Sequence, residues 1–468
     1  MSYQSPFTNR YGSAAMRALW SEDTKRRAWR RVWVAVAEAQ AAAGLVTAQQ
    51  VDDIRANSTR IDVGRAAEIE AEIGHDLMAE LQVFAEQCKV GGGVLHWGLT
   101  SADVEDNADV VRQRAALDLI SSRLRELLLI FADQIDATAD LPVLGYTHLQ
   151  PAEPTTFGYR LAGYAQDLLA HFHALARLRA EIRGKGIKGA VGTGASIAEM
   201  LQGTAVSAEM LEATVMEALG IQAFPVTGQT YPRIQDYSLL SGLAGLAGSL
   251  HKFAFDVRIM QSPAVGQARE PFGEKQVGSS AMPFKRNPVR SEKICSLARL
   301  VASAVSVAWE NAASTLLERT LDDSANRRVI LPEAFLACDE MLTTAAAVLR
   351  GIEIDHEQAG AALDEFAPFA ATERLLSSLV QAGADRQATH ARLREHCLAV
   401  LEAMRGGTPN TLSDRLSSDT NLLRYLQPAR IRELLKAESY LGFASARARA
   451  LAAEIRERTR AAPSKSRR

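Results

Sequence analysis

A long apolar stripe at helical spacing is the feature that most constrains this sequence. Seven apolar residues from Leu239 to Met260 follow one another at alternating intervals of four and three positions, which places them on one side of a helix. Segments 161–178 and 294–308 repeat the pattern. Helices of about 25 to 30 residues with an apolar face need partner helices, so the sequence predicts a bundle. Three glycines within the first helix, Gly242, Gly245 and Gly248, predict close contact with a neighbouring backbone.

Composition limits the partners of such a bundle. The 468 residues are 47% hydrophobic and 23% charged, with a net charge of −2, which is typical of a folded protein and excludes a general attraction to nucleic acid or anionic membranes. The sequence contains no run of about 18 consecutive apolar residues, so it predicts no membrane-spanning helix. The long helices present more apolar surface than one chain is expected to cover. We therefore expect a homo-oligomer that shares a central bundle.

The distribution of helical pattern along the chain predicts an all-α protein with three domains. Shorter helices with glycine-rich turns occupy residues 1–110, the long helices occupy 111–355, and shorter helices return in 356–468. The small and basic residues 461–468 are expected to form a frayed tail.

Two weaker signals point away from metal and dinucleotide sites. The four cysteines, Cys88, Cys295, Cys338 and Cys397, lie far apart without metal-ligand spacing, and the sequence shows no signal-peptide core. We therefore expect reduced thiols and a cytoplasmic location. The run Gly184–Gly189 fits the GxGxxG pattern of dinucleotide sites, but it follows a helix and not a strand, which favours an interhelix loop.

The stretch from Gly278 to Pro288 concentrates groups that can grip an anion. It contains two serine hydroxyls, the cations Lys285 and Arg286 and the amide of Asn287, and it follows a polar run, 264–277, without apolar period. These features predict a mobile loop that closes over a carboxylate-rich substrate and expels water. The alternative is a solvated basic loop.

Three motifs in order resemble the signatures of the fumarase/aspartase superfamily. They are GSSxMPxKxNP at 278–288, HWGLTSAD at 96–103 and GYTHLQPA at 145–152. Within the superfamily the sequence is most similar to the adenylosuccinate lyase family, through TGQTY at 227–231, ERTLDDSANRR at 318–328 and Arg10-Tyr11. The resemblance covers nearly the whole chain. It implies an all-α, three-domain fold with a long central helical bundle shared in a homotetramer.

The resemblance also implies a reaction and a substrate. Members of the family eliminate fumarate from adenylosuccinate, giving AMP, and from succinyl-aminoimidazole-carboxamide ribotide, without a metal or an organic cofactor. The implied partner is therefore a small-molecule nucleotide. Two alternatives stay open: a superfamily lyase that releases fumarate from another succinylated amine, and an inactive helical scaffold that keeps the fold.

Four residues match the family's catalytic positions. Ser279 matches the general base, and a serine hydroxyl acts as a base only where positive charge and amide dipoles stabilise its alkoxide. Lys285 matches a donor that holds the substrate carboxylate into which the negative charge of the carbanion spreads. His148 matches the general acid for the leaving nitrogen, and Glu292 matches a carboxylate that orients this histidine and favours its protonated form.

A larger set matches positions around the substrate. By resemblance these residues are Arg10, Tyr11, His75, Asp76, Thr100, Ser101, Thr147, Gln229, Asn287, Lys293, Arg319, Ser324 and Arg328. A dianionic phosphate calls for guanidinium groups and hydroxyls, which Arg10, Tyr11, Arg319, Ser324 and Arg328 supply. Ser324 is expected to cap a helix N-terminus near Arg328.

Some positions qualify this assignment. The alternative for Arg327 and Arg328, which lie near Asp322 and Asp323, is a surface salt-bridge cluster. The sequence departs from the common family pattern at Phe284, Lys293 and Gly74. These departures concern the detail of substrate preference more than the type of reaction.

Overall fold

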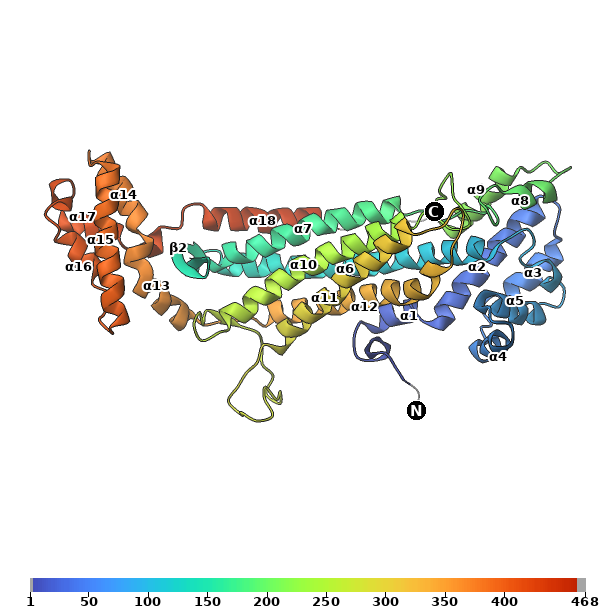
Figure 1. Cartoon of the computed structure of the whole chain (residues 1–468), viewed down its shortest axis with the longest axis horizontal. Helices are drawn as coiled ribbons and strands as arrows, with labels where there is room; N and C mark the ends of the chain where they lie inside the picture. The colour runs from blue at the N-terminus through green and yellow to red at the C-terminus, as the bar shows by residue number, and fades with distance from the viewer. Residues whose placement is uncertain (1–2, 461–468) are drawn as a thin grey trace. The chain divides into compact units, whose positions relative to one another are not determined.

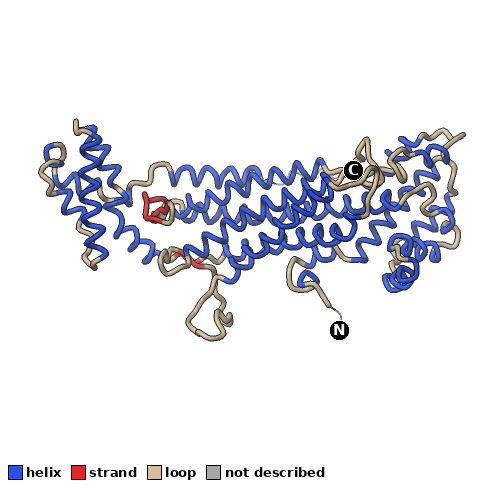
Figure 2. Tube along the Cα trace, in the orientation of Figure 1, coloured by secondary structure: helices blue, strands red, loops and turns tan. Residues whose placement is uncertain are grey.

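The computed structural model describes residues 3–460, which are mostly helical (Figure 2). The chain divides into two compact units. Unit 1 comprises Met1–Leu124, Ala170–Leu250 and Ser296–Thr343, and unit 2 comprises Arg125–Leu169, His251–Cys295 and Thr344–Arg468. The expected all-helical class is confirmed, whereas the three-domain boundaries remain a prediction.

Five long helices contribute residues to both units. They are α6 (Ser101–Thr138), α7 (Phe157–Glu181), α10 (Ile234–Met260), α11 (Val289–Ala313) and α12 (Asp322–Arg350), as labelled in Figure 1. The three segments with apolar stripes therefore form helices as predicted, of 25, 27 and 25 residues. All seven stripe residues of α10 are at most 4% exposed, because the stripe faces other helices along its whole length.

The glycines of α10 approach side chains of α7, which differs from the expected backbone contact. A Cβ at Gly242 would lie 3.1 Å from Leu178, and a Cβ at Gly245 would lie 2.9 Å from the imidazole of His171. Nothing lies within 4 Å of the corresponding point at Gly248. Gly242 and Gly245 thus make room for side chains of α7. The prediction of close packing is wrong for Gly248.

Unit 1 adds shorter elements to its parts of the long helices. These are η1 (Pro6–Thr8), α1 (Ala14–Leu19), α2 (Glu22–Ala42), α3 (Ala48–Asn57), α4 (Val63–Ile73), α5 (Asp76–Gln87), η2 (Gly92–Val94), α8 (Ala195–Met200) and α9 (Ala208–Leu219). Helix α2 packs against α3 and α9, and its Trp29 and Trp33 lie in the hydrophobic core. The 184–189 run forms a loop between α7 and α8, as the sequence analysis expects.

A buried ion triad joins α2 to α5 within unit 1. The carboxylate of Glu80 accepts hydrogen bonds from Arg30 at 2.6 Å and from Arg26 at 3.0 Å, and all three side chains are at most 3% exposed. Arg30 also donates to Gln87 and to the backbone carbonyl groups of Asn57 and Arg60. Burial lowers the pKa of Arg30, and the charge of Glu80 opposes this effect. One guanidinium group therefore holds α2, α5 and the chain after α3 together.

Unit 2 adds two small sheets and a group of C-terminal helices. The strands are β1 (Pro142–Thr147), β2 (Gln150–Thr156), β3 (Ala268–Arg269) and β4 (Glu353–Ile354), paired β1 with β2 and β3 with β4, both antiparallel. The helices are α13 (His356–Ala370), α14 (Thr372–Gln381), α15 (Arg386–Arg405), α16 (Leu412–Ser417), η3 (Leu422–Arg424), α17 (Pro428–Leu434), η4 (Ala437–Ser439) and α18 (Ala444–Arg458). Leucines such as Leu379, Leu393 and Leu416 form a core between α14, α15, α16 and α17.

Two expectations concern single features of the chain. Among the described residues, no helix is long and apolar enough to cross a membrane. All four cysteines are free thiols. The expected tail at 461–468 lies outside the described residues.

Candidate active site

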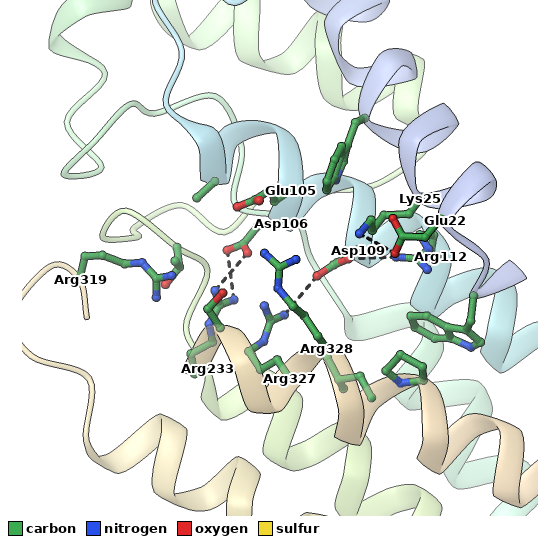
Figure 3. A pocket seen from close by; sticks show the side chains of 17 residues that line it. Glu22, Lys25, Glu105, Asp106, Asp109, Arg112, Arg233, Arg319, Arg327 and Arg328 are labelled. Carbon is green, nitrogen blue, oxygen red and sulfur yellow. Dashed lines mark hydrogen bonds and ion pairs between the residues drawn. The ribbon is translucent and has the colours of Figure 1, made fainter. Parts of the chain in front are cut away.

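A strongly charged pocket lies in unit 1 between α2, α6 and α12 (Figure 3). Its lining carries the cationic side chains Lys25, Arg112, Arg233, Arg319, Arg327 and Arg328 and the carboxylates Glu22, Glu105, Asp106 and Asp109. Clustered guanidinium groups are the donors that a dianionic phosphate requires. The pocket therefore has the chemistry of an anion site, with arginines in excess of carboxylates.

Two of the arginines are buried structural supports of the pocket. Arg233 binds both carboxylate oxygens of Asp106 at 3.1 Å and donates to Asp323 at 2.5 Å. Arg327 donates to Asp236 and to the hydroxyl group of Tyr231, each at 2.7 Å. Burial is the largest single influence on Arg327 and lowers the pKa of its guanidinium group, but Asp236, Tyr231, Asp109 and Asp106 together raise this pKa well above its usual value. Both arginines stay cationic and fix the pocket wall.

The alternative of a surface salt-bridge cluster at 322–328 is wrong for its central residues. Arg327 and Asp323 are 8% and 2% exposed, and their partners come from α6 and from the start of α10. Sequence analysis did not identify Arg233, Asp106 or Asp236 as part of the site. The signal was weak, because each is a single charged residue whose partners are distant in sequence.

Three of the predicted phosphate ligands lie at this pocket. Arg319, Ser324 and Arg328 all belong to its lining. Arg319 donates to Asp323 at 2.7 Å, and Arg328 donates to Asp76 at 2.6 Å. Helix α12 begins at Asp322, so Ser324 lies in the first turn and is not the N-cap that was expected, and Arg328 lies about one turn further on.

A second group of predicted residues gathers where α5 and α6 begin. The imidazole Nε2 of His75 lies 3.2 Å from the hydroxyl group of Ser101. Gln229 donates to the hydroxyl group of Thr100 at 3.3 Å. Asp76 follows His75 and holds Arg328, so the two groups of residues are linked by an ion pair.

The departure at Gly74 has a conformational reason. Gly74 ends α4 with φ of +69°, a left-handed conformation that glycine adopts without a steric penalty. The residue directs the chain from α4 into His75, which precedes the first residue of α5. The left-handed backbone conformation therefore explains why residue 74 is a glycine.

Arg10 and Tyr11 lie on the segment between η1 and α1, and neither belongs to the residues that line the pocket. The guanidinium carbon of Arg10 lies 5.8 Å from the centre of the Tyr11 ring. The backbone nitrogen of the next residue, Gly12, donates to Glu340 at 3.1 Å. The segment is thus anchored to α12. Arg10 and Tyr11 do not line the pocket that holds the other predicted phosphate ligands of the same chain.

His148 lies at the tip of a hairpin in unit 2. Thr147 pairs with Gln150, so His148 and Leu149 alone form the turn, and their φ angles are +54° and +59°. A two-residue hairpin turn with both φ angles positive favours asparagine and glycine, and a bulky residue there is strained. The structure therefore holds an imidazole outward at a conformational cost, which is characteristic of functional residues.

Ser279 lies in the long loop between α10 and α11. Its Oγ accepts hydrogen bonds from the backbone nitrogen atoms of Ala281 at 3.4 Å and Met282 at 3.1 Å. The amide of Asn287 donates to the carbonyl oxygen of Gly278 at 2.9 Å and closes the segment on itself. A Cβ at Gly278 would lie 2.1 Å from the carbonyl oxygen of Lys285, so only glycine fits there. Phe284, the departure within this motif, is 84% exposed.

A buried carboxylate that sequence analysis did not identify fixes the base of this loop. Glu270 is 3% exposed and accepts hydrogen bonds from the backbone nitrogen atoms of Arg290 at 3.0 Å and Ser291 at 2.9 Å. These nitrogen atoms belong to the first turn of α11, where a carboxylate is favourable. Glu292 and Lys293 follow directly on the same turn.

The catalytic residues that resemblance assigns all belong to unit 2. Among residues 3–460, His148 has no hydrogen bond or ion pair with Ser279, Lys285 or Glu292. The predicted phosphate ligands Arg319, Ser324 and Arg328 belong to unit 1. Within the described part of the chain, no group of three or more histidine, cysteine or acidic side chains could hold a metal ion.

Comparisons with known proteins cover nearly the whole chain. Residues 6–303 match the lyase family, and residues 368–450 match the adenylosuccinate lyase C-terminus family. The chain is 39% identical to adenylosuccinate lyase from Schistosoma mansoni, over 89% of this chain and 88% of that protein. It is 37% identical to adenylosuccinate lyase from Saccharomyces cerevisiae, with the same coverage of both chains.

A solved structure agrees with this result at the level of the fold. The fumarate lyase from Mesorhizobium sp. BNC1 superposes with a TM-score of 0.84 at 23% identity, over 97% of this chain and 100% of that chain. The expected fumarase/aspartase-like fold is therefore confirmed. With a family match over more than half of its length and relatives that match over 89% of this chain, the chain belongs to the adenylosuccinate lyase family.

Proposed function

We propose that this protein cleaves adenylosuccinate to AMP and fumarate. The observation that carries the proposal is the arginine-lined pocket of unit 1 in a chain of this family. Guanidinium groups in a partly enclosed site favour the 5′-phosphate dianion of a nucleotide. The same reaction on succinyl-aminoimidazole-carboxamide ribotide follows from the shared succinylamine and phosphate groups.

The chemistry begins with removal of a proton beside a carboxylate. Ser279 takes this proton, and the two backbone N–H groups that donate to its Oγ stabilise the negative alkoxide. Lys285 and Asn287 hold the carboxylate into which the charge of the carbanion spreads. An amide nitrogen carries two N–H groups, so Asn287 can contact Gly278 and a ligand together.

The second half of the reaction breaks the C–N bond. His148 gives a proton to the leaving nitrogen, and Glu292 favours the protonated imidazole. Arg10, Tyr11, Arg319, Ser324 and Arg328 bind the phosphate. Thr100, Ser101 and Gln229 lie around the nucleotide and succinyl portions, and His75, Asp76, Thr147 and Lys293 also contact the substrate. No cofactor takes part, and the four free thiols suit a cytoplasmic enzyme.

The phosphate assignment is tested with purified protein and adenylosuccinate. We expect stoichiometric fumarate and AMP, and a loss of about 10- to 150-fold in kcat/KM for Arg328→Ala, because a hydrogen bond to a charged group contributes about 1.5–3 kcal/mol. Arg350→Ala is the matched control, since Arg350 is an exposed residue at the end of the same helix. Full activity of Arg319→Ala and Arg328→Ala on the native substrate would instead indicate a lyase for a succinylated amine without phosphate.

We also propose that the active enzyme is a homotetramer whose sites combine residues from different subunits. Among residues 3–460, no hydrogen bond joins His148 to Ser279, and the family that the sequence resembles forms such tetramers. Mixed tetramers of Ser279→Ala and His148→Ala subunits are expected to recover roughly a quarter of the wild-type activity if the two residues of a site come from different subunits. Each variant alone serves as the control. Activity of the mixture that stays at the level of the single variants contradicts shared sites.

A further inference from the structure

The pocket of unit 1 contains a carboxylate without a partner in the described chain. Glu105 lies next to Asp106 on α6 and lines the pocket, opposite the arginines of α12 (Figure 3). Among residues 3–460, its carboxylate has no hydrogen bond and no ion pair within 4.0 Å. The carboxylates around it each have an arginine partner: Asp106 binds Arg233, Asp109 binds Arg327 and Asp76 binds Arg328.

Charged groups surround the pocket that Glu105 lines, and those of Asp76, Asp106, Asp109 and Arg328 act on its carboxyl group. The surrounding groups are Asp106, Asp109 and Arg112 on α6, His75 and Asp76 where α5 begins, Glu22 and Lys25 on α2, Arg233 before α10, Arg319 before α12, and Arg327 and Arg328 on α12. The arginines have aspartate partners: Arg233 binds Asp106 and Asp323, Arg319 binds Asp323, Arg327 binds Asp236 and Asp109, and Arg328 binds Asp76. Glu105 is therefore the carboxylate with the least compensation at the position where an anion would bind.

The surroundings favour the neutral form of Glu105. Burial and the charges of Asp76, Asp106 and Asp109 raise the pKa of its carboxyl group to about 8, and the charge of Arg328 opposes them. Near pH 7 the group is therefore mostly a neutral carboxylic acid, which can donate a hydrogen bond.

The geometry points to Glu105 as a proton-linked specificity residue of the nucleotide pocket: the protein binds a phosphate dianion with Glu105 protonated, and ionised Glu105 repels that ligand. This inference rests on the proposed function, because it takes the pocket to be the phosphate site. A bound dianion stabilises the neutral acid further, so binding above neutral pH is coupled to proton uptake.

The sign of the pH dependence follows from this coupling. A ligand that binds the protonated form loses affinity as the pH rises through the pKa of the free protein. Between pH 7 and 9 we expect the dissociation constant of AMP to rise about tenfold. The second ionisation of a phosphate monoester has a pKa near 6, so the ligand is a dianion throughout this range.

The test measures AMP binding by titration calorimetry at pH 7, 8 and 9, in two buffers with different ionisation enthalpies. For the unmodified protein we expect the tenfold rise and an uptake of protons at pH 8. For Glu105→Gln we expect a dissociation constant that changes less than twofold and no proton uptake. Glu22→Gln is the control, because Glu22 lines the same pocket but is 55% exposed and paired with Lys25; it should keep the tenfold rise.

Each outcome decides between the hypotheses. The inference is overturned if Glu105→Gln binds AMP with the same pH dependence and proton uptake as the unmodified protein. In that case tight AMP binding and fumarate release would still support the proposed function. Absence of AMP binding together with absence of fumarate release would contradict the proposed function itself. Circular dichroism of both variants shows whether they are folded.

Discussion

Alanine in place of Ser279 is expected to reduce kcat for fumarate release about 10²–10⁴-fold, the range that one general base contributes. The affinity for AMP should change less than twofold, because Ser279 is not one of the residues proposed to bind the phosphate. The loss should fall on kcat, because the proposed role of Ser279 is to accept the proton in the chemical step. Steady-state kinetics on adenylosuccinate, with AMP as a competitive inhibitor, separate the two effects.

The neighbouring hydroxyl group provides the matched control for this prediction. Ser280 is the next residue in the same loop and is exposed, so Ser280→Ala makes an equal change in size and polarity. We expect it to retain activity within about threefold. A Ser280→Ala variant that is slower than Ser279→Ala would show that the base has been assigned to the wrong serine.

The second large effect concerns stability. Removal of the Glu80 carboxylate by Glu80→Ala is expected to lower the free energy of unfolding by about 3–5 kcal/mol, because it leaves the guanidinium groups of Arg26 and Arg30 buried without their counter-charge. Both arginines lie on α2, and the contacts of Arg30 reach α5 and the chain after α3. Urea unfolding followed by circular dichroism at fixed protein concentration measures the loss.

An exposed ion pair gives the comparison. Glu433 binds Arg430 at 2.8 Å, and both side chains are about half exposed. Glu433→Ala is expected to change the free energy of unfolding far less than Glu80→Ala does, because water and salt screen an exposed pair. If the two substitutions lower the free energy of unfolding equally, the buried triad contributes no more to stability than an exposed ion pair.

The long helices were predictable because a repeated spacing specifies both a helix and its buried face. The stripe of α10 shows this most clearly, since all of its residues are buried. The hairpin that carries His148 was not predicted, because its turn residues, histidine and leucine, are not those that such turns prefer. A strained turn cannot be predicted from its own residues, because the surrounding structure imposes a backbone conformation that those residues do not prefer.

The candidate site was predictable in part, and the reason is similar. One motif predicted Ser279, Lys285 and Asn287 together, since they lie within nine positions of one another. Arg233 and Glu270 were not identified, because each acts through partners from other elements, as in the ion pair with Asp106 and the cap of α11. Contacts between distant positions depend on the fold and are not visible as local patterns.

The two-residue turn at His148 limits which changes of length this segment can accept. Side chains alternate between the two faces of a strand, so one inserted residue between Thr147 and Gln150 would alter the register and turn the imidazole to the other side. Point substitutions in the flanking strands keep its direction. We therefore expect related proteins to differ in the residue types of this hairpin more readily than in the number of residues in its turn.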